Sequence, residues 1–169
     1  ERLAEKFAVE AVLVTAEIDV LRAARLREKL GLPGQGVASA TAYRDKYVMK
    51  SHAAAAGIPV AAMRRVEDPG GVAAFAAEHG YPVVVKRRAG AASIGMHVLD
   101  DEAALAGLPG DWVEPMLAEQ WIEGDLFHVD GIMQDGQVLL SWPSRYLHTQ
   151  WASTSTSATC PSARSCRAS

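Results

Sequence analysis

Apolar and polar residues follow one another in patterns that divide the chain into short helices and strands. Apolar positions at helical spacing, ended by glycine or proline, predict helices over Glu17–Leu30, Thr41–Ala56, Pro69–His79 and Asp101–Ala106. Short apolar or β-branched runs predict strands over Ala11–Thr15, Pro82–Lys86, Met96–Leu99, Met116–Ile122, Leu126–Gln134 and Gln137–Trp142. Helices and strands alternate at first and give way to antiparallel strands later, which predicts a mixed α/β or α+β fold.

Three local signals mark the ends of these elements. Gly31 followed by Pro33 ends the first helix, and Asp68 followed by Pro69 supplies an N-cap with proline at the first helical position. Asp135-Gly136 between two apolar runs is typical of a two-residue hairpin turn. The last two predicted strands should therefore form a hairpin.

Residues 151–169 have a different composition from the rest of the chain. They contain six Ser, three Thr and four Ala but no Asp, Glu, Leu, Ile or Val, so they are not expected to build a core. Two explanations of this composition compete. One is a natural disordered terminus, and the other is a frame shift or truncation that replaced a C-terminal region. The abrupt change after Gln150 favours the second. Both cysteines, Cys160 and Cys166, lie here, which excludes a disulfide framework or a four-cysteine zinc site within one chain.

Composition adds only broad limits. The chain has 169 residues, of which 49% are hydrophobic and 22% charged, which is typical of one globular domain or two small ones. A net charge of −3 and a pI near 6.0 give no overall attraction to nucleic acid or anionic membranes. No apolar run approaches the roughly 20 residues of a membrane span, and the charged first residues do not resemble a signal peptide. We therefore expect a cytoplasmic protein without nucleic-acid or membrane partners.

The segment Tyr81–Val98 carries the clearest candidate for ligand binding. Lys86 ends a β-branched strand, and a loop of small residues with Gly90, Ser93 and Gly95 leads to the next strand. Successive loop N–H groups and a lysine can bind one anion, and phosphate is the natural one. The segment contains neither a Walker motif nor a GxGxxG fingerprint. A flexible hairpin with a basic edge explains the same residues, and composition alone does not exclude it.

Four other residues are weaker candidates taken singly. Lys46 lies early in a predicted helix, where a solvated helix face is the simpler interpretation. Glu119 lies on a predicted strand, which as a bare pattern is an edge strand with polar residues. His128 and Asp130 share a strand face, as a metal or phosphate pair would, but chance alternation gives the same spacing.

The order of these segments resembles a known family. RDKYVMKSHAAAAGIPV, then VVVKRRAGAASIGMHV, then MLAEQWIEGDLFHVDGIMQDGQV resemble the ATP-grasp superfamily, which contains biotin carboxylase, carbamoyl phosphate synthetase and many carboxylate–amine ligases. The resemblance covers about residues 36–145. It implies a partial ATP-grasp fold: a remnant of a preceding α/β domain over 1–35, helical and small β subdomains over 36–115, the first strands of the central sheet over 116–150, and the tail over 151–169.

The resemblance also implies roles for single residues. Lys46 and Lys86 match the two lysines that hold ATP phosphates, and residues 89–95 match the loop that closes over them. The adenine hinge matches Glu119, Gln120, Trp121 and Ile122. His128 and Asp130 fall where relatives set polar groups near the nucleotide.

Two departures limit what the resemblance implies. Leu126 stands where many relatives carry an acid that reaches the ribose, and the late acidic pair that binds Mg²⁺ has no counterpart after Asp135. We therefore expect the ATP-binding part of a ligase that activates a carboxylate as an acyl phosphate for attack by an amine or thiol, with ATP and Mg²⁺ in complete relatives, and inactive as written. A stand-alone nucleotide-binding or regulatory module is the alternative, and a scaffold without a ligand is a third.

Overall fold

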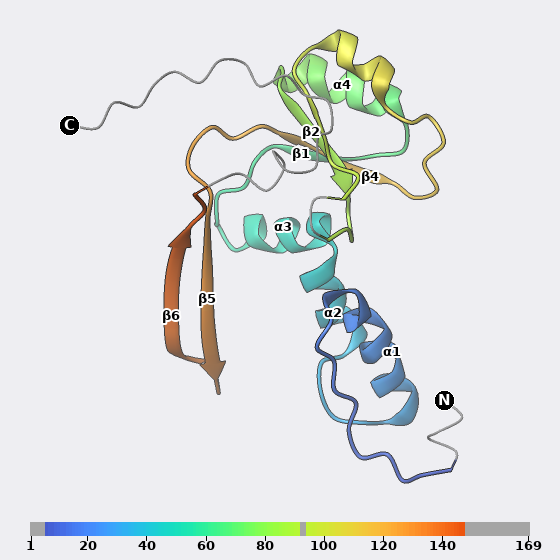
Figure 1. The fold of residues 1–169 in the computed structure, drawn as a ribbon, viewed down its shortest axis with the longest axis vertical. Helices are drawn as coiled ribbons and strands as arrows, with labels where there is room; N and C mark the ends of the chain where they lie inside the picture. The colour runs from blue at the N-terminus through green and yellow to red at the C-terminus, as the bar shows by residue number, and fades with distance from the viewer. Residues whose placement is uncertain (1–5, 92–93, 148–169) are drawn as a thin grey trace, which may run out of the picture. The chain divides into compact units, whose positions relative to one another are not determined.

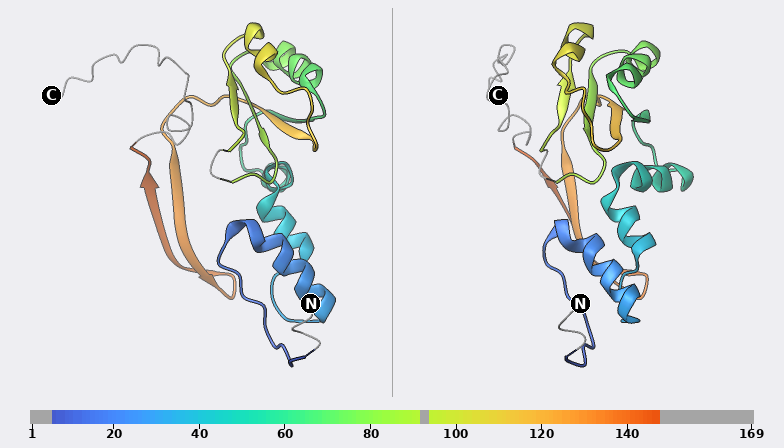
Figure 2. Two further views of the ribbon diagram at one scale, coloured as in Figure 1. Left: turned by 45° about the vertical axis from the view of Figure 1, so that its right-hand side comes forward. Right: turned by 90° about the vertical axis from the view of Figure 1, so that its right-hand side faces the viewer.

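The computed structural model describes residues 6–91 and 94–147, and the chain divides into two compact units between Ile122 and Glu123. The first unit contains the helices and a four-stranded sheet, and the second contains a β-hairpin (Figures 1 and 2). No helix in the described ranges is long and apolar enough to cross a membrane. The expectations for the tail, including Cys160 and Cys166, lie outside the described residues.

The first unit begins with an extended segment and a helix. A short 3₁₀ helix, η1 (Glu17–Asp19), leads into α1 (Val20–Leu30), and Gly31 closes α1 in the left-handed conformation at φ 64°, as predicted. The predicted strand over Ala11–Thr15 is wrong, because these residues pair with no described strand. The carbonyl group of Val12 has another partner: the buried Arg27 donates to Val12 O from Nε at 3.1 Å and from Nη2 at 2.6 Å.

The single helix predicted over Thr41–Ala56 is also wrong. The structure has α2 (Val37–Arg44), which lies beside α1, and a separate α3 (Lys46–Ala55) (Figure 1). Asp45 separates them because its backbone is extended (φ −89°, ψ 109°) and its carboxylate caps α3, accepting from Tyr47 N at 3.0 Å and Val48 N at 3.3 Å. An aspartate that can cap the next helix therefore ends the first one.

The sheet has the order β1 (Met63–Val66), β4 (Met116–Gln120), β2 (Val83–Arg87) and β3 (His97–Leu99), and every pairing is antiparallel. Helix α4 (Pro69–His79) and the 3₁₀ helix η2 (Glu102–Gly107) lie side by side against one face (Figures 1 and 2). The predicted cap of α4 is confirmed, since Asp68 accepts from Gly71 N at 2.8 Å. The core between sheet and helices contains Val66, Val72, Phe75, Val83, Val85, Leu99, Met116 and Ala118.

The second unit confirms the predicted hairpin. Strands β5 (Phe127–Gln134) and β6 (Gln137–Arg145) pair around Asp135 and Gly136, which have φ values of 51° and 78°, as a two-residue type I′ turn requires. Gly131 allows the strands to approach, because a Cβ there would lie 2.8 Å from Leu140 O. Strand β4 belongs to the sheet of the first unit, so the two units divide after Ile122; the boundaries of the sequence analysis stay predictions.

Candidate functional site

The sheet of the first unit has a polar cluster on the face opposite its core. Strand residues alternate between the two faces, so Val83 and Val85 enter the core while Val84 and Lys86 lie on the other side. Glu119 on β4 is the register partner of Val84 and therefore lies diagonally opposite Lys86. The antiparallel pairing thus brings together two residues that are 33 positions apart in the chain.

The carboxylate of Glu119 is the centre of this cluster. Its side chain is only 5% exposed, and its two oxygens lie 2.6 Å from Lys50 Nζ and 2.5 Å from Lys86 Nζ. Burial by itself raises the pKa of Glu119, but the nearby ammonium groups of Lys86 and Lys50 outweigh it and hold the pKa below its ordinary value. Glu119 is therefore a buried carboxylate that stays charged because two lysines face it.

Lys46 approaches the same cluster from the first position of α3. Its ammonium group donates to Gly90 O at 2.6 Å, which ties α3 to the loop after β2. The pKa of Lys46 lies below its ordinary value, first because the side chain is partly buried and then because Lys86 and Arg44 repel its charge. Lys46 therefore lies in a site with an excess of positive charge.

The first residues of the loop after β2 are held by the junction of α2 and α3. Arg44 donates to Ala89 O at 2.8 Å, and Lys46 N donates to Arg88 O at 2.9 Å. Asp45 and Arg88 form an ion pair with Oδ2 and Nη2 2.5 Å apart. These contacts fix the base of the loop beside the lysine cluster, the name used here for Lys46, Lys50, Lys86 and Glu119.

The glycines predicted in this loop have different surroundings. Gly95 has a φ of 69°, which favours glycine, and a Cβ at Gly90 would lie 3.2 Å from the Cβ of Arg87. Ser93 lies outside the described residues. The structure thus places Gly90 at the cluster through its carbonyl group, and the role of the loop in closing over a ligand stays a prediction.

The predicted hinge continues directly from β4. Gln120 N donates to Ala62 O at 2.9 Å, and Trp121 N donates to Pro82 O at 3.1 Å, so these two N–H groups bind the protein itself. Ile122 follows with its side chain 66% exposed. Among the predicted hinge residues, Glu119 takes part in the lysine cluster through its side chain.

His128 and Asp130 lie on β5 in the second unit. His128 Nε2 is 3.1 Å from Asp130 Oδ2, and the His128 ring contacts Tyr146 edge-on at 4.9 Å between centroids. This pair has a local role within the hairpin. Its predicted place near a nucleotide stays a prediction.

Sequence reasoning missed Lys50. Its signal was present, because Lys46 and Lys50 are four residues apart and so lie on one face of α3. In the described part of the chain, no group of three or more His, Cys, Asp or Glu side chains could hold a metal ion. The ammonium groups of Lys46, Lys50 and Lys86 suit the cluster to an anion.

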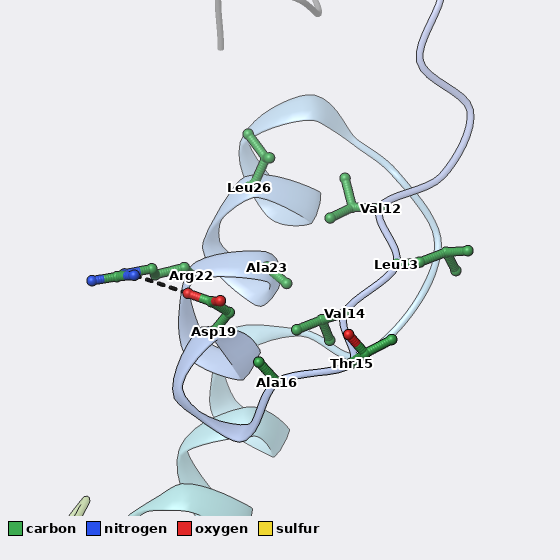
Figure 3. A pocket seen from close by; sticks show the side chains of 9 residues that line it. All are labelled: Val12, Leu13, Val14, Thr15, Ala16, Asp19, Arg22, Ala23 and Leu26. Carbon is green, nitrogen blue, oxygen red and sulfur yellow. Dashed lines mark hydrogen bonds and ion pairs between the residues drawn. The ribbon is translucent and has the colours of Figure 1, made fainter.

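A second concave site lies between residues 12–16 and α1 (Figure 3). It has a volume of about 340 Å³, and Val12, Val14, Ala23 and Leu26 give it an apolar lining, while Asp19 and Arg22 pair with each other at 2.9 Å. It shares no residue with the lysine cluster.

Comparison with known proteins gives three consistent results. The family described as "Carbamoyl-phosphate synthase L chain, ATP binding domain" matches residues 45–111, which include Lys46 and Lys86. The L-arginine-specific L-amino acid ligase of Bacillus subtilis is 30% identical over 144 residues, covering 80% of this chain and 35% of the ligase. The chain thus spans about a third of the length of the curated relatives it matches.

Solved structures show the same fold. The L-amino acid ligase of Bacillus licheniformis superposes with a TM-score of 0.63 at 22% identity, covering 81% of this chain and 32% of that one. The biotin carboxylase domain of the Hydrogenobacter thermophilus 2-oxoglutarate carboxylase, solved with MgADP and bicarbonate, has a TM-score of 0.60 at 23% identity, covering 75% and 31%. Together with the matched residues 45–111 and the related ligase, these structures show that the chain is similar in sequence to ATP-grasp enzymes and shares their fold.

Proposed function

We propose that this chain forms the ATP-binding part of an ATP-dependent ligase. In that reaction the γ-phosphoryl group of ATP passes to a carboxylate oxygen and ADP leaves; an amine or thiol then attacks the acyl carbon, and inorganic phosphate leaves. The observation that carries the proposal is that Lys86, which contacts Glu119, and Lys46, which contacts the loop at Gly90, lie close enough for their charges to repel each other. ATP, a small carboxylate and a nucleophile are the partners that follow from it.

The charge of the cluster fits a polyphosphate. Lys50 and Lys86 contact the Glu119 carboxylate and Lys46 lies near it, so the ammonium groups outnumber the carboxylate. Burial, and then repulsion from Lys86 and Arg44, lowers the pKa of Lys46. A triphosphate bound here relieves that repulsion, and fixed cations stabilise the charge that develops when a phosphoryl group is transferred.

The strand that carries Glu119 also supports a purine beside the phosphates. Among the described residues, the N–H of Ile122 donates to no backbone or side-chain group, whereas the N–H groups of Gln120 and Trp121 are already used. A backbone donor that the described chain leaves unused suits the edge of a flat base.

Magnesium does not have a site of its own in the described residues, since they contain no group of three suitable ligands. Under this proposal Mg²⁺ reaches the site bound to the phosphate oxygens of the nucleotide, where it neutralises charge. We assign no metal ligand and no metal-dependent step to this chain.

Calorimetric titration with MgATP tests the proposal. We expect Lys46→Met and Lys86→Met each to weaken binding about 10- to 100-fold, because a hydrogen bond to a charged group contributes roughly 1.5–3 kcal/mol. Lys6→Met is the matched control, because Lys6 is an exposed lysine of the same unit. The proposal is wrong if the wild type does not bind MgATP, or if Lys86→Met binds it as well as Lys6→Met does.

Turnover separates the two functional alternatives. ADP release that depends on an added carboxylate and amine supports the ligase. Binding of MgATP without such release, in a cooperatively folded sample, supports a nucleotide-binding or regulatory module instead.

A further inference from the structure

We propose that Lys50 is a positioning residue that holds the Glu119 carboxylate and so leaves Lys86 available to an incoming phosphate. This inference rests on the proposed function of the cluster as a nucleotide site. It assigns a role to a residue that does not itself contact the nucleotide.

The geometry divides the two lysines between the two oxygens of Glu119. Lys50 Nζ lies 2.6 Å from Oε1, and Lys86 Nζ lies 2.5 Å from Oε2. Lys50 comes from α3 and Lys86 from β2, so the two cations reach the carboxylate from different elements.

The burial of Glu119 makes this division necessary. A carboxylate that is only 5% exposed is strongly destabilised when it has no counter-ion. If Lys86 were its single partner, a phosphate that binds Lys86 would have to leave a buried negative charge unpaired beside a second negative group. With Lys50 in place, the carboxylate keeps one ammonium group while Lys86 turns to the phosphate.

The spacing on α3 supports the same division. Lys46 and Lys50 are one helical turn apart, and the first contacts the loop at Gly90 while the second contacts Glu119. Lys50 is engaged with a carboxylate that the protein supplies itself. Under this proposal Lys50 neutralises the Glu119 carboxylate, whereas Lys46 and Lys86 bind the ligand.

A double-mutant cycle distinguishes this role from a direct phosphate contact. We expect Lys50→Met to weaken MgATP binding about tenfold in the wild-type background but less than about twofold in the Glu119→Gln background, where no charge has to be held. Lys50→Arg, which keeps the charge, should bind within about threefold of the wild type. An equal loss in both backgrounds, or no loss in either, overturns the proposal.

A second measurement on the ligand-free protein keeps this test separate from that of the proposed function. The labelling rate of Lys86 by an amine-reactive ester, read by mass spectrometry, should fall severalfold in Lys50→Met, because Glu119 then engages Lys86 alone; exposed Lys6 serves as the internal standard. Unchanged labelling of Lys86 overturns the inference whether or not ATP binds. Slower labelling in a protein that fails to bind MgATP supports the inference and overturns the proposed function.

Thermal unfolding of each variant checks that it is folded. If Lys50→Met does not unfold cooperatively, Lys50→Gln replaces it in both measurements, because the amide keeps a hydrogen-bond donor near Oε1 without the charge. The same results then support or overturn the proposal.

Discussion

Asp45→Ala tests whether the junction of α2 and α3 is held by a charge pair as well as by a helix cap. Asp45 Oδ1 accepts from Tyr47 N at 3.0 Å and from Val48 N at 3.3 Å, which satisfies two N–H groups at the start of α3. The same carboxylate pairs with Arg88, with Nη2 and Oδ2 2.5 Å apart and Nε and Oδ1 3.1 Å apart. The substitution removes both interactions at once.

The expected loss follows from these two contributions. An N-cap replaced by alanine costs about 1 kcal/mol of unfolding free energy. Breaking a fully buried ion pair costs about 3–5 kcal/mol, but the Arg88 side chain is 21% exposed and water partly compensates it, so we expect about 2 kcal/mol here. Asp45→Ala should therefore lower the free energy of unfolding by about 3 kcal/mol.

Urea unfolding with two matched variants separates the contributions. Asp68→Ala removes the cap of α4, which is an exposed aspartate accepting from Gly71 N at 2.8 Å, and should cost about 1 kcal/mol. Asp45→Ser keeps a capping oxygen but loses the pair with Arg88, and should cost about 2 kcal/mol. If Asp45→Ala costs no more than Asp68→Ala, the ion pair contributes nothing and the reasoning is refuted.

Three further outcomes are expected from unfolding measurements. The pKa of Lys46 is lowered by burial and then by Lys86, so between the lowered pKa and 10.5 the folded chain binds fewer protons than the unfolded chain. The free energy of unfolding should therefore rise with pH in this window, and Lys46→Met should abolish the rise. The pKa of Glu119 is lowered from 4.5, because Lys86 and Lys50 outweigh burial. The contribution of the Glu119 charge to the free energy of unfolding is present above pH 4.5 and should disappear as the pH falls through the pKa of the folded state. Glu119→Gln should show no such change. Phe75→Ala should cost about 3–5 kcal/mol, because this ring is fully buried, and a loss below about 1 kcal/mol would contradict its place in the core.

The elements that sequence predicted well are those whose signals are local. The hairpin turn at Asp135-Gly136 and the cap at Asp68 depend on residues within a few positions, and the structure has both. The strand β2 was predicted from its run of β-branched valines, which is rich enough to indicate a strand without knowing its neighbours.

The elements that sequence missed depend on contacts between distant residues. Strand β1 has the sequence MRRV, in which Arg64 and Arg65 interrupt the apolar pattern, and its pairing with β4 is what makes it a strand. The apolar run over Ala11–Thr15 shows the reverse case, since it has the composition of a strand but no described partner. The sequence pattern places Asp45 inside one long helix, because its ion pair with Arg88, 43 residues later, depends on the fold.

In the candidate site, too, the sequence identifies residues but not the contacts between them. The family resemblance pointed to Lys46, Lys86 and Glu119, and the structure brings all three together. It did not show that Glu119 is shared with Lys50, because that contact depends on how α3 lies relative to β4. Sequence could therefore nominate the charged residues, but their pairing required the fold.

Side chains of β2 and β4 alternate between the two faces of the sheet, so one face packs in the core and the other carries the lysine cluster. Val83, Val85 and Ala118 enter the core, whereas Lys86 and Glu119, which are their immediate neighbours in the chain, form the cluster on the opposite face. A one-residue shift in the β2–β4 register would move the lysine into the core and the valines out of it. The apolar core therefore fixes the register that brings Lys86 to Glu119. Because this constraint acts through the backbone, conservative changes within the core should alter stability before they alter the geometry of the cluster, whereas changes to the register would disrupt both.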